Sequence, residues 1–473
     1  MKGKAFALIL LFCAASLGAK VKLPTLMGDN MILQQQTEVK LWGKATPKAE
    51  VRVTPSWSGK TTACRADKDG NWLLTVSTPK AGYTPYDITF DDGEKTSVKN
   101  VLIGEVWLAS GQSNMEMPLK GFGGCCIMNG ADDIIAAADN KGVRMFTVPR
   151  GQSYEPKTEC EGSWNIASID TAPDFSATAY HFATSLSRAL QIPVGIINSS
   201  YGGATVEGWI NRKLLETYPD ITLNPDSIER MNHMQRPMLM YNAMLKPLQN
   251  YTIKGFIWYQ GESNVGRHDT YAQRLADMVQ LWRNEWGLGE LPFYFVEIAP
   301  YAYGGTQDGK SAYLREAQFK AQSLIPNSAM ISTNDLVESF ERYNIHPRNK
   351  TMVGHRLSYL ALNLTYGKKQ FVCFGPQYKD LMIEGNKALV SFDHLEMGIC
   401  RNYELRGFEI AGEDRVFYPA DDVKLRWQTN HIILTSEKVP HPVAVRYCFR
   451  DFQIGTMIGG NELPLIPFRT DNW

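Results

Sequence analysis

The sequence predicts an α/β protein, with a mostly parallel central sheet covered by helices and a β region on either side of it. Three observations predict this class. The chain has 473 residues, more than one hydrophobic core usually holds, since cores stop growing at about 250–300 residues. Between residues 101 and 370, apolar runs of strand length alternate with helical patterns, as in parallel sheets buried on both faces. Before and after that segment, short runs alternate with period two, which predicts half-buried strands.

The first 19 residues resemble a secretory signal peptide. Lys2 and Lys4 precede an apolar run over 5–17, and the small residues Gly18 and Ala19 follow it. The run is shorter than the ~20 apolar residues that a membrane-spanning helix needs, and we expect no membrane span later in the chain. The expected product is an exported protein, periplasmic or extracellular.

Residues 20–100 predict an N-terminal β-sandwich. The segments 39–43 and 72–76 alternate apolar and polar residues, which is typical of strands with one buried face. The dipeptide Asp92-Gly93 favours a tight turn between two strands.

Residues 101–370 predict the α/β domain, and residues 371–473 predict a C-terminal β domain with short alternating strands. Within the α/β domain, the apolar runs that predict strands lie at 105–109, 194–198, 255–259, 293–298 and 329–333. The segments that predict helices lie at 180–190, 271–286, 311–324 and 351–362.

The charge of the chain excludes some partners. It has 49 basic and 49 acidic residues and a formal net charge of zero, so no broad field attracts nucleic acid or an anionic membrane. An apolar fraction of 44% excludes a disordered chain. The aromatic fraction of 11% suits surfaces that stack on sugars, and large aromatic cores explain it equally well.

The cysteines give no sign of a metal site. Removal of residues 1–19 leaves an odd number of cysteines, with spacings that match no zinc template, and we expect no metal or organic cofactor. Cys160 could form a disulfide with Cys125 or Cys126 in an oxidising compartment. Free, buried cysteines are the equal alternative.

Polar residues follow four of the predicted strands, where ligands of open α/β sheets bind. These segments are Ser110-Gly111-Gln112-Ser113-Asn114, Ser200-Tyr201-Gly202-Gly203, Gln260-Gly261-Glu262-Ser263-Asn264, and Asn334-Asp335 with Ile345-His346-Pro347 beyond it.

Together these segments contain the parts of an acyl-transfer site. A serine hydroxyl needs a neighbouring base, and an imidazole is such a base near neutral pH. The oxyanion of the intermediate needs preset donors, which the amides of Ser113 and Gly203 and a Gln or Asn side chain could supply. Each residue alone has a commoner structural role, as a helix cap, a turn or a packed histidine. Their occurrence at successive strand ends favours catalysis.

Three motifs resemble the sialate O-acetylesterase family of SGNH-type hydrolases. They are Gly111-Gln112-Ser113-Asn114-Met115, the segment 258–264 and the segment 345–350, and further likeness at 29–34, 241–244 and 467–471 extends over nearly the whole mature chain. The resemblance implies that Ser113 is the nucleophile and His346 the base. It also suggests Gly203 and Gln260 as oxyanion donors, with Asn264 as a weaker candidate.

The acid that would orient His346 stays open. Many SGNH enzymes have Asp three residues before the histidine, where this chain has Tyr343. Asp335 is the candidate, because similar sequences have Asp-Leu at a comparable distance upstream. In the alternative, Asp335 caps a turn, a backbone carbonyl orients His346, and the site is a Ser-His dyad.

Two further residues are candidates for substrate binding. Glu262 could act as a second acid, as in glycosidases, but a hydrogen bond to the Ser113 loop is the favoured role. Arg348, like Arg315, could pair with a substrate carboxylate, although helix ends and surfaces are the usual places for arginine.

The sequence thus predicts a secreted serine esterase that removes O-acetyl groups, with O-acetylated sialic acid as the first candidate substrate. Acetylxylan or another acetylated polysaccharide is the alternative, because the nucleophile motifs do not select the sugar. A glycan-binding protein without activity is the second alternative. The oligomeric state is not predicted.

Overall fold

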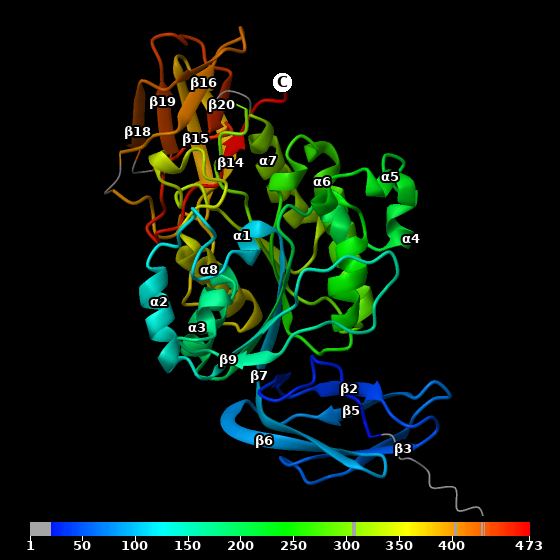
Figure 1. Cartoon of the computed structure of the whole chain (residues 1–473). Helices are drawn as coiled ribbons and strands as arrows, with labels where there is room; N and C mark the ends of the chain where they lie inside the picture. The colour runs from blue at the N-terminus through cyan, green and yellow to red at the C-terminus, as the bar shows by residue number, and fades with distance from the viewer. Residues whose placement is uncertain (1–19, 305–308, 402–403, 427–428, 430) are drawn as a thin grey trace, which may run out of the picture.

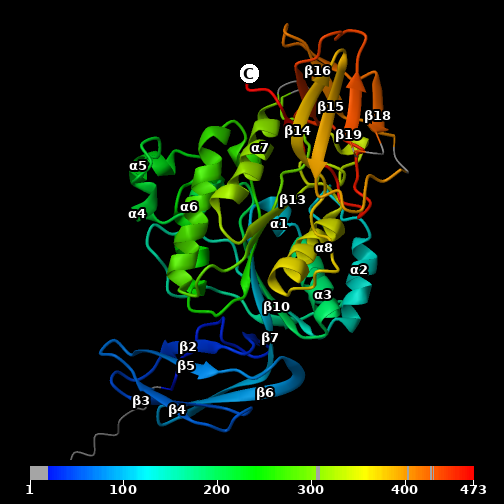
Figure 2. The ribbon, with the colours of Figure 1, turned by 180° about the vertical axis from the view of Figure 1, so that it is seen from behind.

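The computed structural model describes residues 20–304, 309–401, 404–426, 429 and 431–473, and the expected signal peptide lies outside them. A β part at the N-terminus and a β part at the C-terminus lie at opposite ends of a helix-covered central sheet (Figure 1). Seen from behind, helices lie on both sides of that sheet (Figure 2). The predicted fold class is confirmed, including the β region on each side of the α/β domain.

The N-terminal part is a sandwich of two sheets. One is the antiparallel pair β2 (Glu38–Lys44) and β5 (Asn71–Ser77). Every second residue of β5 is buried, at Trp72, Leu74 and Val76, because alternate side chains of a strand point to opposite faces. The other sheet contains β1 (Ile32–Gln34), β3 (Glu50–Pro55), β4 (Thr62–Arg65), β6 (Gly82–Asp91) and the start of β7.

The strand β7 (Lys95–Gly111) joins the sandwich to the central sheet without a linker. It is 17 residues long. Its first half pairs antiparallel with β6, and its second half pairs parallel with β10 and β11. From Val101 to Gly111 every residue of β7 is buried, because this half has a neighbouring strand on each edge and helices over both faces.

The central sheet has the order β13-β12-β11-β7-β10-β8-β9. All neighbours along it are parallel except β9, which runs antiparallel to β8. Besides β7, its strands are β8 (Val143–Thr147), β9 (Trp164–Ile166), β10 (Val194–Ser200), β11 (Gly255–Tyr259), β12 (Phe293–Val296) and β13 (Ser328–Ile331). The sequence pattern predicts all of these except β8 and β9.

Two pairs of long helices cover the two faces. On one side lie α3 (Ala177–Leu190) and α8 (Lys350–Leu360), and on the other lie α6 (His268–Trp286) and α7 (Lys310–Leu324) (Figures 1 and 2). Each pair packs into its own apolar cluster against the sheet. The short helices are α1 (Ser113–Glu116), α2 (Gly130–Ala136), α4 (Arg212–Leu215) and α5 (Pro225–Glu229).

The C-terminal part packs two four-stranded antiparallel sheets around a separate apolar core. It docks on α7, where Arg315 donates a 3.1 Å hydrogen bond to the Cys448 carbonyl and Arg469 pairs with Glu316 at 2.9 Å. One sheet contains β14 (Gln377–Glu384), β15 (Lys387–Asp393), β19 (His431–Thr435) and β18 (Asp422–Arg426). The other contains β17 (Phe417–Pro419), β16 (Phe408–Ala411), β20 (Ala444–Tyr447) and β21 (Phe468–Arg469).

No disulfide forms among the cysteines of the described residues, so Cys160 is not bonded to Cys125 or Cys126. Burial raises the pKa of the Cys160 thiol to about 11.

Among the helices in the described part of the chain, none has the length and apolarity to cross a membrane.

Candidate active site

Ser113 lies at the turn from β7 into the short helix α1. The preceding Gly111 has φ +142°, and a Cβ on it would lie 2.1 Å from the Tyr259 carbonyl oxygen. Only glycine therefore allows β7 and β11 to end so close together. This close approach places Ser113 at the carboxyl edge of the sheet, half-buried, as the first residue of a helix.

The loop after β10 passes beside Ser113. A Cβ on Gly202 would lie 3.5 Å from the Ser113 Cβ, and the Gly202 N–H donates to Glu116 at 2.9 Å. Gly203 has φ +76°, a conformation that favours glycine. In the described part of the chain, no hydrogen bond uses the backbone N–H of Ser113 or Gly203. Both groups are therefore free to bind an oxyanion.

Gln260 and Asn264 are fully engaged behind the glycine loop. The Gln260 Nε2 donates to the Ala204 carbonyl at 3.1 Å and to the Asn264 Oδ1 at 2.7 Å. The Asn264 Oδ1 also accepts from the Val206 N–H at 3.0 Å, and its Nδ2 donates to Glu207. Because both amino hydrogens of Gln260 are used, these amides hold the loop that carries Gly203. We therefore leave them out of the oxyanion hole.

His346 lies on the loop before α8. Its ring packs edge-on against Phe122, with 5.3 Å between centroids, and its backbone N–H donates to Asn344 at 3.0 Å. Burial, aided by the nearby Lys350 cation, lowers the pKa of His346 to about 4. The imidazole is therefore neutral at pH 7, as a general base must be.

The imidazole makes no hydrogen bond within the described residues, either to Ser113 or to a carboxylate. Catalytic hydrogen bonds are often long in the free enzyme and tighten when substrate binds. The two residues are instead linked through their neighbours, because the Asn114 Nδ2 donates to the Ile345 carbonyl at 3.0 Å.

Asp335 lies at a strand end, as expected, but its carboxylate binds another partner. Its two oxygens accept hydrogen bonds from Arg356 of α8 at 2.7 and 2.6 Å. Within the described residues, no hydrogen bond joins Asp335 to His346. The arrangement agrees with the dyad alternative in lacking an Asp335–His346 bond, but within the described residues no backbone carbonyl bonds the imidazole, and the dyad stays a prediction.

Glu262 does hydrogen-bond the Ser113 loop, through Asn114. The Asn114 Nδ2 donates to the Glu262 Oε1 at 2.5 Å, and Lys350 donates to the Asn114 Oδ1 at 2.6 Å. Burial raises the pKa of Glu262 and lowers that of Lys350 to about 7. Sequence reasoning missed Lys350, because His346 lies on the loop before α8 and no helical spacing relates the two residues.

Of the two candidate arginines, Arg348 lies on the loop of His346. Its guanidinium lies 5.1 Å from the ring centroid of Phe340, whose side chain is 70% exposed. It forms no ion pair within the described residues. Arg315, by contrast, donates through its Nη2 to the carbonyls of Cys448 and Arg450 at the C-terminal interface described above.

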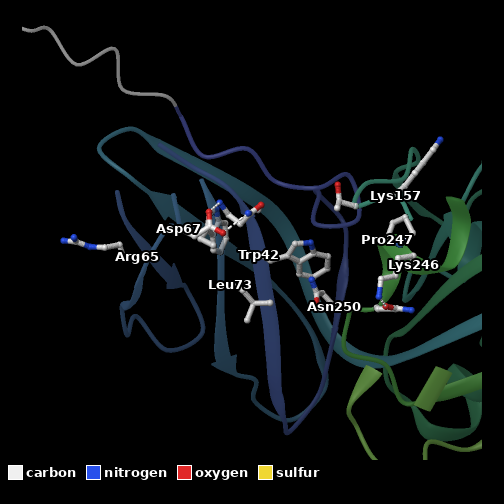
Figure 3. Close-up of a pocket in the computed structure, with 13 residues that line it drawn as sticks. Trp42, Arg65, Asp67, Leu73, Lys157, Lys246, Pro247 and Asn250 are labelled. Atoms are coloured by element: carbon white, nitrogen blue, oxygen red, sulfur yellow. Dashed lines mark hydrogen bonds between the residues drawn. The ribbon is translucent and has the colours of Figure 1, made fainter. Parts of the chain in front are cut away.

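A hollow of about 470 Å³ lies far from these residues, between the N-terminal sandwich and the α/β domain. Figure 3 shows Trp42 and Leu73 on one side of it and Lys246, Pro247 and Asn250 on the other. Its lining comes mainly from β2, β5 and the segments 157–158 and 246–250, whereas Ser113 follows the end of β7. Because no candidate residue lines it, this hollow is not the catalytic pocket.

Across the described residues, no group of three or more His, Cys, Asp or Glu side chains is arranged to hold a metal ion.

A serine at a strand-to-helix turn, free N–H groups beside it and a neutral histidine define the site of a carboxylic ester hydrolase. The family model described as "carbohydrate esterase, sialic acid-specific acetylesterase" matches residues 103–363. The match covers more than half of the sequence, and the chain belongs to this family. The family expected from the motifs is thus confirmed.

Individual relatives agree with this assignment. The chain is 27% identical to sialate O-acetylesterase from Mus musculus over 470 residues, with 86% of each chain covered. It is 27% identical to the Homo sapiens enzyme of the same name over 436 residues, covering 85% of this chain and 82% of the relative. A carbohydrate acetylesterase from Xanthomonas citri has a similar structure, with a TM-score of 0.84, 33% identity, and 96% and 100% of the two chains covered.

Proposed function

We propose that the chain removes O-acetyl groups from sugars through an acyl-enzyme on Ser113, with His346 as the base. The observation that carries this proposal is the position of Ser113 beside Gly202, directly before the free N–H of Gly203, with Asn114 joined to the loop of the neutral His346.

The reaction would proceed in two halves. The Ser113 Oγ attacks the acetyl carbonyl carbon while its proton passes to His346, and the oxyanion binds the N–H groups of Ser113 and Gly203. As the ester bond breaks, His346 returns the proton to the sugar oxygen. A water molecule then attacks the acetyl-enzyme and gives a proton to His346. Acetate leaves, and the Ser113 hydroxyl takes back its proton.

The proposed site is a dyad. The Asp335 carboxylate is held by Arg356, so it does not take part in the mechanism that we propose. A neutral imidazole can accept a proton without an acid behind it, although a lower pKa makes it a weaker base.

For the substrate, we propose an O-acetylated sialic acid. The names of the family model and of the mammalian relatives support it. Arg348 supports it as well, because an arginine near the site without a carboxylate partner among the described residues could bind the carboxylate of an acidic sugar. An acetylated neutral polysaccharide is the alternative, since the Xanthomonas citri protein is named only as a carbohydrate acetylesterase.

We also propose that the enzyme is exported. The composition of residues 1–19 supports this. Mass spectrometry of the protein recovered outside the cytoplasm should find an N-terminus near Lys20, and an uncleaved cytoplasmic chain would contradict export.

The test compares wild type with Ser113→Ala, using p-nitrophenyl acetate, acetylated sialic acid and acetylated xylan. Ser185→Ala, on α3 and away from the site, is the matched control. We expect Ser113→Ala to abolish acetate release and Ser185→Ala to retain it. Activity in a folded Ser113→Ala variant would refute the mechanism, and faster release from xylan would favour the alternative substrate. Glycan binding without any turnover by wild type would support the binding-protein alternative.

A further inference from the structure

The side chains of Lys350, Asn114 and Glu262 come from three different segments and meet beneath the candidate site. We propose that they form one positioning unit that fixes the His346 loop against Ser113, in the place that an orienting acid holds in a catalytic triad. This inference rests on the proposed function of Ser113 and His346.

The geometry places Asn114 at the centre of the unit. Asn114 directly follows Ser113, and its Nδ2 donates to the carbonyl of Ile345 at 3.0 Å. Ile345 directly precedes His346. A single amide therefore joins the residue after the nucleophile to the residue before the base, and the distance between the two loops depends on it.

Charges at both ends fix the orientation of that amide. Lys350 donates to the Asn114 Oδ1 at 2.6 Å, and the Glu262 Oε1 accepts from the Nδ2 at 2.5 Å. A rotation of the amide by 180° would turn its amino group toward the ammonium and its oxygen toward the carboxylate. Since charge-assisted hydrogen bonds are about twice as strong as neutral ones, the observed orientation is strongly favoured.

Stability alone does not explain this unit. Lys350, Asn114 and Glu262 are 1%, 0% and 7% exposed, and well-packed apolar residues would usually stabilise such a position as well or better. Lys350 is also the first residue of α8, where the helix dipole disfavours a cation. Its partners explain its presence, since Glu262 and Glu341 attract its charge and the ring centroid of Tyr259 lies 5.4 Å from its Nζ.

The unit also acts on the imidazole itself. Besides burial, the charge of Lys350 is what lowers the pKa of His346. The groups around Lys350 are Glu262, Glu341 and Cys125, and Phe122 packs on the imidazole ring. Loss of the ammonium should therefore raise the pKa of His346, in addition to loosening its loop.

The test is Lys350→Met, measured as the pH profile of kcat/KM on p-nitrophenyl acetate. We expect kcat/KM to fall about 10²-fold, as displaced catalytic groups do, mainly through kcat, and the acid limb to move to higher pH. A merely structural lysine would not move that limb. Lys246→Met, a lysine remote from the site that bonds Gln249, is the control and should match wild type.

A second variant covers the case in which Lys350→Met does not fold. Lys350→Met combined with Glu262→Gln removes both members of the buried Lys350–Glu262 pair, and Glu341 keeps its bonds from the N–H groups of Glu338 and Arg348, so this variant should fold and show the same loss of kcat. This inference would be overturned if either folded variant kept the wild-type kcat/KM and the wild-type acid limb. If Ser113→Ala were inactive in the same assay, the proposed function would still stand. Activity in Ser113→Ala would instead overturn the proposed function.

Discussion

Asp335 and Arg356 form a bidentate ion pair, in which the two carboxylate oxygens accept hydrogen bonds from the guanidinium at 2.7 and 2.6 Å. The pair ties the end of β13 to α8, the helix that follows the His346 loop. Arg356 is 3% exposed and also donates to the Ser332 carbonyl at 2.9 Å. Asp335 therefore stabilises the fold around the site.

Asp335→Asn should destabilise the protein and leave the chemistry largely intact. The change leaves the buried guanidinium of Arg356 unpaired, which costs about 3–5 kcal/mol in the free energy of unfolding. We expect kcat at 25 °C to stay within about threefold of wild type, since the mechanism that we propose uses no proton transfer to this carboxylate. Urea unfolding and acetate release check the two expectations. A fall of kcat by about 10⁴-fold, as for the loss of a triad acid, would restore Asp335 as the orienting acid.

The activity should persist into acid solution. The pKa of His346 is about 4, below the ordinary value of ~6.5, so the imidazole stays a base until the pH falls through about 4. The unfolded chain takes up this proton below about 6.5, so the stability that the neutral imidazole contributes is lost between about pH 6.5 and 4. A pH profile of kcat/KM with its acid limb near 4 is expected, and a limb near 6.5 would contradict the burial of this ring.

Gly203→Ala should displace an oxyanion donor, because the backbone N–H stays but the loop that carries it must shift. Its φ of +76° strains any side chain, and a Cβ there would lie 2.6 Å from the Met234 Sδ. We expect kcat to fall about 10²–10³-fold, as when one donor is lost, while KM changes little. Gly59→Ala is the matched control, with φ +65° and open space around its Cβ. Equal losses of kcat in the two variants would show that backbone strain alone is responsible.

Arg348→Ala should separate acidic from neutral substrates. If this guanidinium binds a carboxylate, kcat/KM on acetylated sialic acid should fall at least tenfold, since hydrogen bonds to charged groups contribute about 1.5–3 kcal/mol. The value on p-nitrophenyl acetate, which has no carboxylate, should not change. Arg415→Ala, whose guanidinium lies over Trp473, is the control. An equal loss on both substrates would mean that Arg348 only supports the loop of His346.

The helices and inner strands could be predicted from the sequence because their apolar pattern is local. The predicted helix 271–286 falls within α6, and the run 255–259 is β11 itself. The edge strand β9 has three residues, and β8 contains the buried Arg144, so neither has the pattern of an apolar run. Their places in the sheet depend on pairing with β10 and on each other.

The site residues could be located but not their partners. Strand ends correctly indicated where Gln260 and Asp335 lie, yet the direction of a side chain depends on what packs around it. Arg356 follows Asp335 by 21 residues, and no periodicity marks that pair. Glu262 was expected to bond the Ser113 loop, whereas the buried Lys350 that completes its network appears only when α8 is placed against the sheet.

The continuous strand β7 means that the N-terminal sandwich is not a detachable module. The residues that pair with β6 and those that lead to Ser113 belong to one strand, so a cut at residue 100 would expose the buried Val101 and Leu102 and remove their partners. A shortened enzyme that begins at the α/β domain should therefore fold poorly. The sandwich and the catalytic domain should melt together in one cooperative transition, and a protease that cleaves the sandwich should inactivate the esterase although it never reaches the active site.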